Sequence, residues 1–200
     1  MDINPMDAVE QPEQTTADRA VMRLNMLVAV TVALLATFMG ICKVKDDNIV
    51  QAMQAAQTNK IDHWAFYQAR NIREEIAKST VVQLRLAALS RPATERADYD
   101  AAIQNYETIA REQSKKKEEL KTLAEQDQKD YDAANFRDDQ FDLSDALLAI
   151  AISLLAVTAL THQKWLYWLA LLPTGYGVFM GLAGLLGWGV HPDAVVRLLS

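Results

Sequence analysis

Three apolar runs without a charged residue constrain this chain more than any other feature. They cover residues 24–42, 146–161 and 165–190, whereas residues 43–142 hold 35 of the 46 charged side chains. A soluble core would instead distribute its apolar residues at helical or strand spacing along the chain. The runs have 19, 16 and 26 residues, and about 20 helical residues cross a hydrocarbon layer of about 30 Å. The sequence therefore predicts an all-α membrane protein with three transmembrane helices.

The bounds of the three expected spans follow from their flanks. The first, at residues 23–43, is too long for a signal-peptide core of about 7–15 residues and lacks a small-x-small cleavage site, so we expect a retained anchor. The second and third are expected at residues 143–161 and 165–190, joined so tightly that they form an antiparallel hairpin. The third has aromatic residues typical of membrane interfaces at both ends, namely Trp165, Tyr167, Trp168 and Trp188.

The polar insert at residues 44–142 predicts an extramembrane α-helical hairpin. Pro92 interrupts two long segments without Pro or Gly, so two arms of nearly equal length are expected to meet at a tip near residues 90–93. No helix breaker separates an arm from its neighbouring span, so each pair is expected to form one continuous helix. At about 1.5 Å per residue, each arm would extend about 70–75 Å. The stripe expected to pack the first arm against the second includes Ile49, Ala56, Ile61, Ile72, Ile76, Val82 and Leu86.

Self-association is the next expectation. The stripe of the hairpin is thin and drifts around the helix, whereas helices gain most of their stability from packing. We therefore expect a coiled-coil-like pairing of the arms and a homo-oligomer in which neighbouring copies cover the remaining surface. In the last span, Gly177 and Gly181 form a GxxxG motif that Gly184 extends. Small residues at this spacing let helix backbones approach closely, within one chain or between subunits.

The densest aromatic cluster lies in the first arm, in the sequence HWAFYQAR at residues 63–70. Trp64 and Tyr67 share a helix face, and Arg70 follows one turn later. Two interpretations stay open for these three residues. They pack the hairpin and its neighbours together, or they form a patch for an unidentified protein partner or ligand, because Trp, Tyr and Arg are frequent in interaction hot spots. A metal site is not expected, since the adjacent Asp62 and His63 do not face one point on a helix.

Several classes of function are disfavoured by what the sequence lacks. No ionisable residue lies near the centre of an expected span, where transporters and proton relays usually carry one. A net charge of −6 disfavours nucleic acid as a partner. Cys42 is the single cysteine, so no intrachain disulfide forms, and the Walker, HExxH and GxSxG motifs are absent. We expect no enzymatic activity, no cofactor and no metal.

Three stretches of the chain resemble the bacterial domain of unknown function 4337 family. They are CKVKDDN at residues 42–48, HWAFYQAR at residues 63–70, and the Trp-rich final helical pair. The Trp-Ala-x-Tyr-Gln-Ala core at 64–69 is the most specific part, and the resemblance covers most of the chain. It implies an uncharacterised bacterial inner-membrane protein with this layout, and it assigns no catalytic residue.

Basic residues near the spans predict the orientation. Arg19, Arg23 and Lys164 lie in short segments on the N-terminal side, against Arg197 on the other side. Counting the hairpin flanks as well brings the two sides nearly level, but long inserts cross largely regardless of charge. We therefore expect a cytoplasmic N terminus and a periplasmic hairpin. An acidic, disordered tail is expected at residues 1–22, and a short tail at residues 191–200.

These observations lead to two hypotheses for function. The first is a non-enzymatic, homo-oligomeric protein of the lipid bilayer whose projecting hairpins scaffold an assembly or bind a partner. The alternative is a subunit of an oligomeric channel or transport-associated complex, in which hydroxyl side chains line a pore. Those hydroxyls would come from Thr31, Thr37, Ser153, Thr158 and Thr161, although such groups in membrane helices more often bond to their own backbone.

Overall fold

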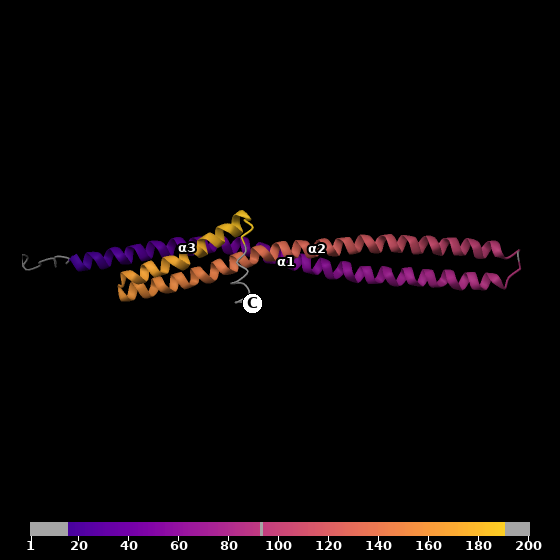
Figure 1. The fold of residues 1–200 in the computed structure, drawn as a ribbon, viewed down its shortest axis with the longest axis horizontal. Coiled ribbons are helices and arrows are strands. Elements are labelled where there is room, and N and C mark those ends of the chain that lie inside the picture. Colours follow the sequence, from indigo (N-terminus) through magenta and orange to yellow (C-terminus); the bar gives the residue numbers. More distant parts are fainter. Residues whose placement is uncertain (1–15, 93, 191–200) are drawn as a thin grey trace, which may run out of the picture. The chain divides into compact units, whose positions relative to one another are not determined.

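The computed structural model describes residues 16–92 and 94–190. Within these residues the chain forms three α-helices and no strand: α1 (Thr16–Leu89), α2 (Arg96–Thr161) and α3 (Lys164–Leu186) (Figure 1). The all-α prediction is confirmed. Tertiary contacts divide the chain into a three-helix unit, Met1–Asn48 with Phe136–Ser200, and a hairpin unit, Ile49–Asn135.

The first two helices are unusually long, with 74 residues in α1 and 66 in α2. Gly40 is the only residue inside α1 that strongly weakens a helix, and α2 contains neither Gly nor Pro. Nothing therefore ends either helix where the apolar sequence gives way to the polar insert. The prediction that each arm is continuous with its neighbouring apolar run is confirmed.

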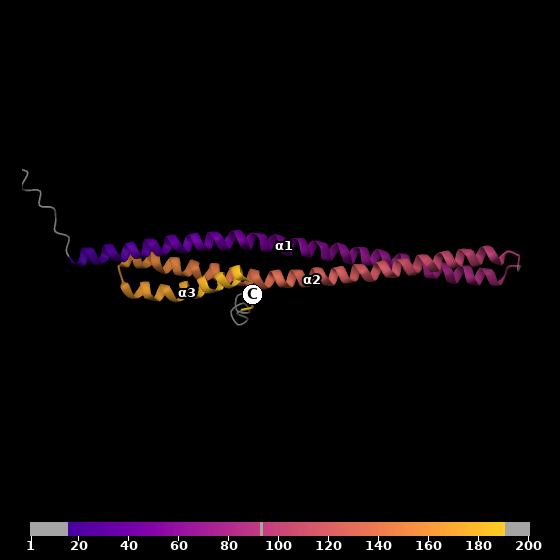
Figure 2. The same ribbon diagram turned by 90° about the horizontal axis from the view of Figure 1, so that it is seen from above.

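In the three-helix unit, α3 turns back along α2 (Figures 1 and 2). His162, with a left-handed φ of 56°, makes the turn, and its N–H donates to the carbonyl of Thr158 over 2.9 Å. The core between the helices is apolar and joins all three. Its buried members are Val28, Leu35, Leu148, Ala151, Leu155 and Ala170.

In the hairpin unit, the arms of α1 and α2 run side by side in opposite directions (Figures 1 and 2). The register is visible in three polar pairs: Lys60 with Gln128 at 2.8 Å, Glu74 with Lys117 at 2.7 Å, and Arg85 with Glu107 at 2.5 Å. As the residue numbers rise along α1, those of their partners on α2 fall. The two long helices are thus packed antiparallel.

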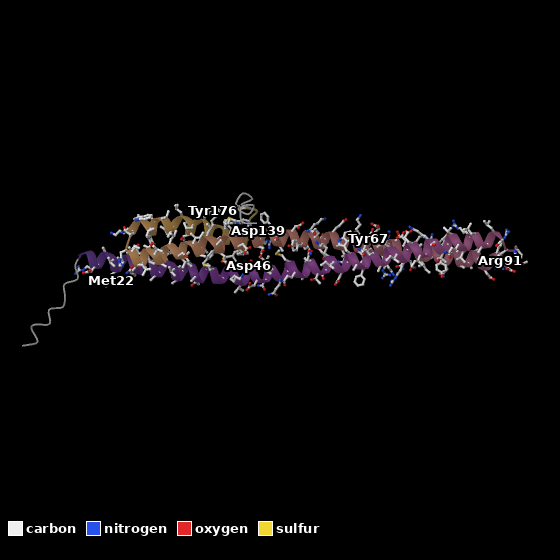
Figure 3. The ribbon with its side chains drawn as sticks, turned by 90° about the horizontal axis from the view of Figure 1, so that it is seen from below. Met22, Asp46, Tyr67, Arg91, Asp139 and Tyr176 are labelled. Atoms are coloured by element: carbon white, nitrogen blue, oxygen red, sulfur yellow. The ribbon has the colours of Figure 1, made fainter. Side chains whose placement is uncertain are left out.

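The turn of the hairpin unit falls between Leu89 and Arg96, around the predicted tip at residues 90–93. Ser90 and Arg91 donate their N–H groups to carbonyls three residues back, over 3.2 Å each, which tightens the end of α1. The guanidinium of Arg91, labelled in Figure 3, lies 3.6 Å from the carboxylate of Glu95.

Two helix bounds differ from the expected ones. Helix α3 ends at Leu186, before residue 190, because Gly187 takes a left-handed φ of 70° and Trp188 donates its N–H to the Ala183 carbonyl over 2.9 Å. Helix α1 begins at Thr16, so the last residues of the expected disordered tail are helical. The remainder of that tail, residues 1–15, and the expected tail at 191–200 lie outside the described residues.

Each of the three helices contains a segment that is long and apolar enough to cross a membrane, judged by length and composition. The expected spans at residues 23–43 and 143–161 lie inside α1 and α2, and α3 covers most of the expected span at 165–190. The polar arms of α1 and α2 make up the hairpin unit.

Candidate functional site

The glycines of α3 form a close seam inside the three-helix unit. A Cβ atom built on Gly177 would lie 2.9 Å from Cγ of Leu148, and one on Gly181 would lie 2.7 Å from the Phe38 ring. At Gly184 the nearest atom, on the Phe141 ring, would be at 2.8 Å. All three glycines are buried. Their contacts are therefore made within the chain, against both α1 and α2.

Two buried polar side chains of α2 fasten α3 along this seam. Ser144 donates its hydroxyl to the carbonyl of Gly177 over 2.8 Å. Gln140 donates its amide to the carbonyls of Trp188 and Val190, over 2.9 and 2.6 Å. The Gln140 bonds pair backbone oxygens just beyond the end of α3, where the helix itself offers no donor. The seam is thus fixed by polar contacts as well as by shape.

A group of carboxylates in the three-helix unit was not recognised as a cluster in the sequence. Asp46 of α1 is only 4% exposed and faces α2, where Asp138, Asp142 and Asp145 repeat at helical spacing. Lys43 supplies a counter-charge, with its Nζ 2.8 Å from Oδ2 of Asp46. Figure 3 labels Asp46 on α1 and Asp139, which neighbours Asp138 on α2. The signal was the i, i+4, i+7 spacing of aspartates on one face of α2.

Burial, and then the charge of neighbouring carboxylates, raises the pKa of two of these groups, Asp138 and Asp142. Burial, then the charge of Asp142 and a hydrogen bond to Asp46, raises the pKa of Asp138 to about 6. Burial and the charge of Asp46 also raise the pKa of Asp142. Oδ1 of Asp46 is buried and has no hydrogen-bond donor among the described residues. A proton on Asp138 would supply a donor to the Asp46 carboxylate, which two ionised carboxylates cannot provide for each other.

In the hairpin unit, two of the three predicted patch residues, Tyr67 and Arg70, contact the other arm. Trp64 and Tyr67 meet edge to face, with ring centroids 5.2 Å apart, and Lys117 of α2 lies over the Tyr67 ring at 5.9 Å. Arg70 donates to the side-chain oxygen of Gln113 over 3.0 Å. Trp64 remains 37% exposed. Tyr67 and Arg70 therefore join the two arms, whereas Trp64 packs on Tyr67 of its own helix and leaves part of its indole on the surface.

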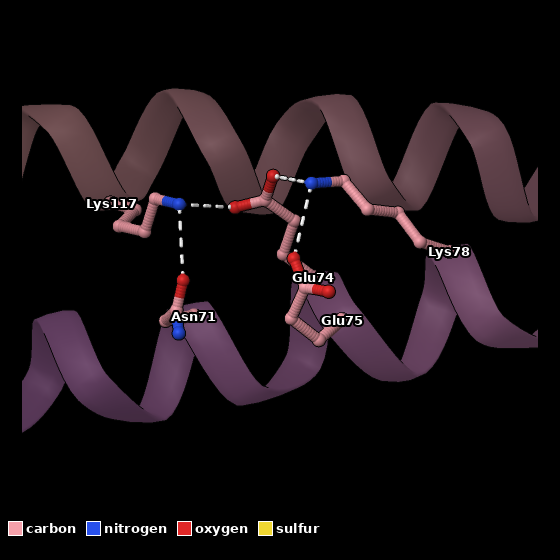
Figure 4. A network of polar contacts seen from close by, with 5 residues as sticks. All are labelled: Asn71, Glu74, Glu75, Lys78 and Lys117. Atoms are coloured by element: carbon pink, nitrogen blue, oxygen red, sulfur yellow. Dashed lines mark hydrogen bonds and ion pairs between the residues drawn. The ribbon is translucent and has the colours of Figure 1, made fainter.

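Glu74 is the centre of a polar network in the same unit (Figure 4). Its carboxylate, 4% exposed, forms ion pairs with Lys78 of its own helix, at 2.6 Å, and with Lys117 of α2, at 2.7 Å. Lys117 also donates to Asn71 over 3.1 Å. Hydrogen bonds from Lys117 and then Lys78 hold the pKa of Glu74 below its usual value. The network takes the place of apolar packing at the middle of the hairpin.

The apolar stripe predicted to pack α1 against α2 is wrong for five of its large residues, whereas Ile49 and Ala56 are buried as expected. The buried face of α1 in the hairpin unit consists of Ile49, Ala56, Glu74, Ala77 and Val81. Five large residues assigned to that stripe are instead between 56% and 63% exposed: Ile61, Ile72, Ile76, Val82 and Leu86. Alanine at the contact lets the two arms lie close together, and the larger side chains point away. The drift of the expected stripe was the signal that α1 carries two apolar faces.

These five residues, which we call the outer stripe, lie on one side of α1. At about 100° per residue they fall within about a third of the helix circumference, opposite Glu74, Ala77 and Val81. A depression of about 440 Å³ lies within it, lined by residues that include Ile72, Ile76, Ser79 and Gln83. Exposed apolar surfaces are common at protein interaction sites. No group of metal-binding side chains occurs among the described residues.

Comparison with known proteins identifies the family of the chain. A family described as "Domain of unknown function (DUF4337)" matches residues 24–187, which include both apolar ends and the whole hairpin. No curated protein and no solved structure matches the chain. The match agrees with the resemblance carried by residues 42–48 and 63–70. The chain therefore belongs to the DUF4337 family of domains of unknown function.

Proposed function

We propose that this chain is a multi-pass membrane protein that associates with copies of itself through its hairpin unit and serves as a non-enzymatic scaffold. The outer stripe of α1 is the observation that carries the proposal. It is an apolar face on the polar part of the chain, and no other segment of the described chain covers it. A second copy is the occupant that we propose for it.

Outward-facing apolar residues in the three-helix unit support insertion in a bilayer. Several large apolar side chains are exposed there, and each lies in a segment with no charged residue. They are Met26, Leu34, Leu160, Trp168 and Leu172. Water would be an unfavourable neighbour for so much apolar surface, and lipid chains would be a favourable one. We assign the chain to the bacterial inner membrane, with a cytoplasmic N terminus and the hairpin unit in the periplasm.

The composition of the outer stripe favours an identical partner. Between its apolar residues lie the exposed, uncharged Gln68, Ser79 and Gln83. The charged residue among them, Glu75, is paired with Lys78 at 3.1 Å. Two copies of such a face meet without a line of like charges, as the self-complementary interface of a two-fold dimer requires. Burying each isoleucine fully would contribute about 1.5–3 kcal/mol, part of which offsets the cost of association.

The test replaces Ile72 and Ile76 together with Gln in the full-length protein. We expect the wild type to form an oligomer in mild detergent, and the double variant to dissociate with a Kd raised roughly tenfold or more. Sedimentation and chemical crosslinking in membranes measure the change. Phe66→Gln is the matched control, because Phe66 is 60% exposed on the same helix but lies outside the outer stripe.

Two results would contradict the proposal. One is an unchanged oligomer in the Ile72→Gln/Ile76→Gln variant, with helicity equal to that of the wild type. The other is recovery of the wild type in the soluble fraction after an alkaline wash of membranes. The periplasmic side is tested separately with Thr122→Cys, because Thr122 is exposed on α2, outside the outer stripe. A membrane-impermeant thiol reagent should label it in intact cells, since the native Cys42 is buried.

The channel alternative has less support in the contacts of its proposed lining. Each of the five hydroxyls considered for a pore donates to the carbonyl four residues earlier in its own helix, over 2.8 to 2.9 Å. Such hydroxyls have already used their hydrogen and offer less to a permeating ion.

A further inference from the structure

A cavity of about 550 Å³ lies in the three-helix unit beside the start of α1 and the start of α3. Its rim is basic, because Arg19 and Arg23 of α1 approach Lys164, the first residue of α3. None of the described residues that line it is acidic. Cations from two distant parts of the sequence are thus collected around one space.

The positive charge of this rim is not compensated within the described part of the chain. No ion pair or hydrogen bond joins Arg19, Arg23 or Lys164 to a side chain there. Lys164 also stands at the N-terminus of α3, where the helix dipole is positive, and Gln163 gives that terminus no side-chain cap. A positive side chain is unfavourable at the N-terminus of a helix. An anion bound there would offset the charges of Arg19, Arg23 and Lys164 together.

The floor and wall of the cavity are apolar and aromatic. Leu24 and Leu27 line it from α1, and Tyr167 and Trp168 line it from α3. The two rings meet edge to face with centroids 6.3 Å apart, and the Tyr167 hydroxyl lies 3.2 Å from that of Thr31 on α1. The wall is therefore held in place before any ligand arrives. A basic rim above an apolar floor matches a molecule that is itself anionic at one end and apolar at the other.

We infer that this cavity binds the phosphate group of an anionic phospholipid, with Arg19, Arg23 and Lys164 around the phosphate and the acyl chains along Leu24 and Leu27. Guanidinium groups bind phosphate oxygens through paired N–H donors, and basic pockets between membrane helices suit anionic headgroups. A free phosphate ester shares the headgroup chemistry but would leave the apolar floor unused. The inference rests on the membrane insertion proposed above.

The test measures lipid binding to the full-length protein in mild detergent by native mass spectrometry. Phosphatidylglycerol and phosphatidylcholine with identical acyl chains are titrated, and inorganic phosphate and glycerol phosphate form separate arms. We expect phosphatidylglycerol to bind at least about tenfold more tightly than phosphatidylcholine. The variant Arg19→Gln/Arg23→Gln/Lys164→Gln should lose that preference.

A charge-matched control separates a site from a general effect of net charge. Lys115→Gln/Lys116→Gln/Lys129→Gln removes three cations of the hairpin unit, none of which lines the cavity, and should keep the full preference. Circular dichroism in phosphatidylcholine micelles confirms that both triple variants are folded. Equal loss in both variants, or no preference in the wild type, would overturn the inference. Equally tight binding of free glycerol phosphate would support a phosphate site and overturn the lipid as its source.

Failure of this inference is distinguishable from failure of the proposed function. A chain that resists alkaline extraction but shows no preference for phosphatidylglycerol is a membrane protein without this site. A chain recovered in the soluble fraction contradicts the proposed function itself, and the lipid titration then shows whether the cavity binds anionic amphiphiles in any case.

Discussion

Single glycines decide how closely α3 packs in the three-helix unit. Replacing Gly177 with Ala would place a methyl group 2.9 Å from Cγ of Leu148 and 3.2 Å from Cβ of Leu147. Both atoms lie near the backbone of α2, so the side chains cannot swing aside and the helices must separate. We expect a loss of about 1–3 kcal/mol in the free energy of unfolding, measured by denaturation in mixed detergent micelles.

Gly175 is the matched control for this substitution, because a Cβ atom there meets nothing within 4 Å. Gly175→Ala should be neutral, or more stable by up to about 1 kcal/mol, since Ala is the better helix former. Equal stability of the two variants would show that the seam tolerates an extra methyl group and that Leu147 and Leu148 do not limit the approach of α3.

At the same scale, Asp138 makes the three-helix unit sensitive to pH. Its pKa of about 6 in the folded state lies above the usual value for Asp, so the folded chain binds a proton more readily than the unfolded chain. The resulting stability is fully present below the usual pKa of Asp and is lost as pH rises through about 6. We therefore expect a higher melting temperature at pH 5 than at pH 7.5.

Asp138→Asn tests the origin of this dependence. The amide mimics the protonated carboxyl and donates to Asp46 at every pH, so the difference between pH 5 and pH 7.5 should shrink, with a remainder from Asp142. Asp130→Asn is the control, because Asp130 is an exposed residue of the hairpin unit that accepts from Gln126 at 2.8 Å. The assignment fails if Asp138→Asn retains the full pH dependence.

Among the elements, the paired arms of the hairpin unit depend on Glu74. Although its side chain is 4% exposed, only two helices surround it, so water lies one side-chain layer away and screens its ion pairs. We expect Glu74→Gln to cost about 1 kcal/mol of hairpin stability, close to the value of a surface pair. Hydrogen exchange of residues 60–120 measures the loss.

The control for Glu74 is Glu119→Gln, which removes an equal charge from an exposed position on α2 and should leave exchange unchanged. Acid should weaken the network, because the lowered pKa of Glu74 makes its contribution disappear as pH falls through that pKa. The hairpin unit therefore responds to acid in the opposite direction to Asp138. An increase in hairpin protection at low pH would contradict this role for Glu74.

The helices themselves were largely predictable from the sequence, whereas the faces they present were not. Pro92 and the absence of other breakers located the turn between α1 and α2, because backbone chemistry is local. The face of α1 that meets α2 is set by the partner helix, so size alone misassigned Ile72 and Ile76 to it. Small Ala77 and the paired Glu74 occupy that contact instead. A single helix with two apolar faces gives a drifting period, and periodicity cannot say which face is inside.

For the whole molecule, the division into charge-free and polar parts was visible in composition. The grouping of distant residues was not, since Asp46 with Asp138, or Arg19 with Lys164, depends on how the helices align in three dimensions. The glycine seam was predictable in part. The motif at Gly177 and Gly181 predicted close packing, but the residues that it packs against are known only from the structure. Membership of the DUF4337 family assigns no activity to the chain.

The outer stripe has a consequence that depends on anchoring. Under the proposed membrane insertion, copies are held in one bilayer, so the effective concentration of one hairpin around another is set by the number of chains per unit of membrane area. Association that is negligible for free hairpins in dilute solution becomes favourable once chains are crowded in a membrane patch. On this basis, oligomer size should follow the density of chains in the membrane and so report local expression or clustering.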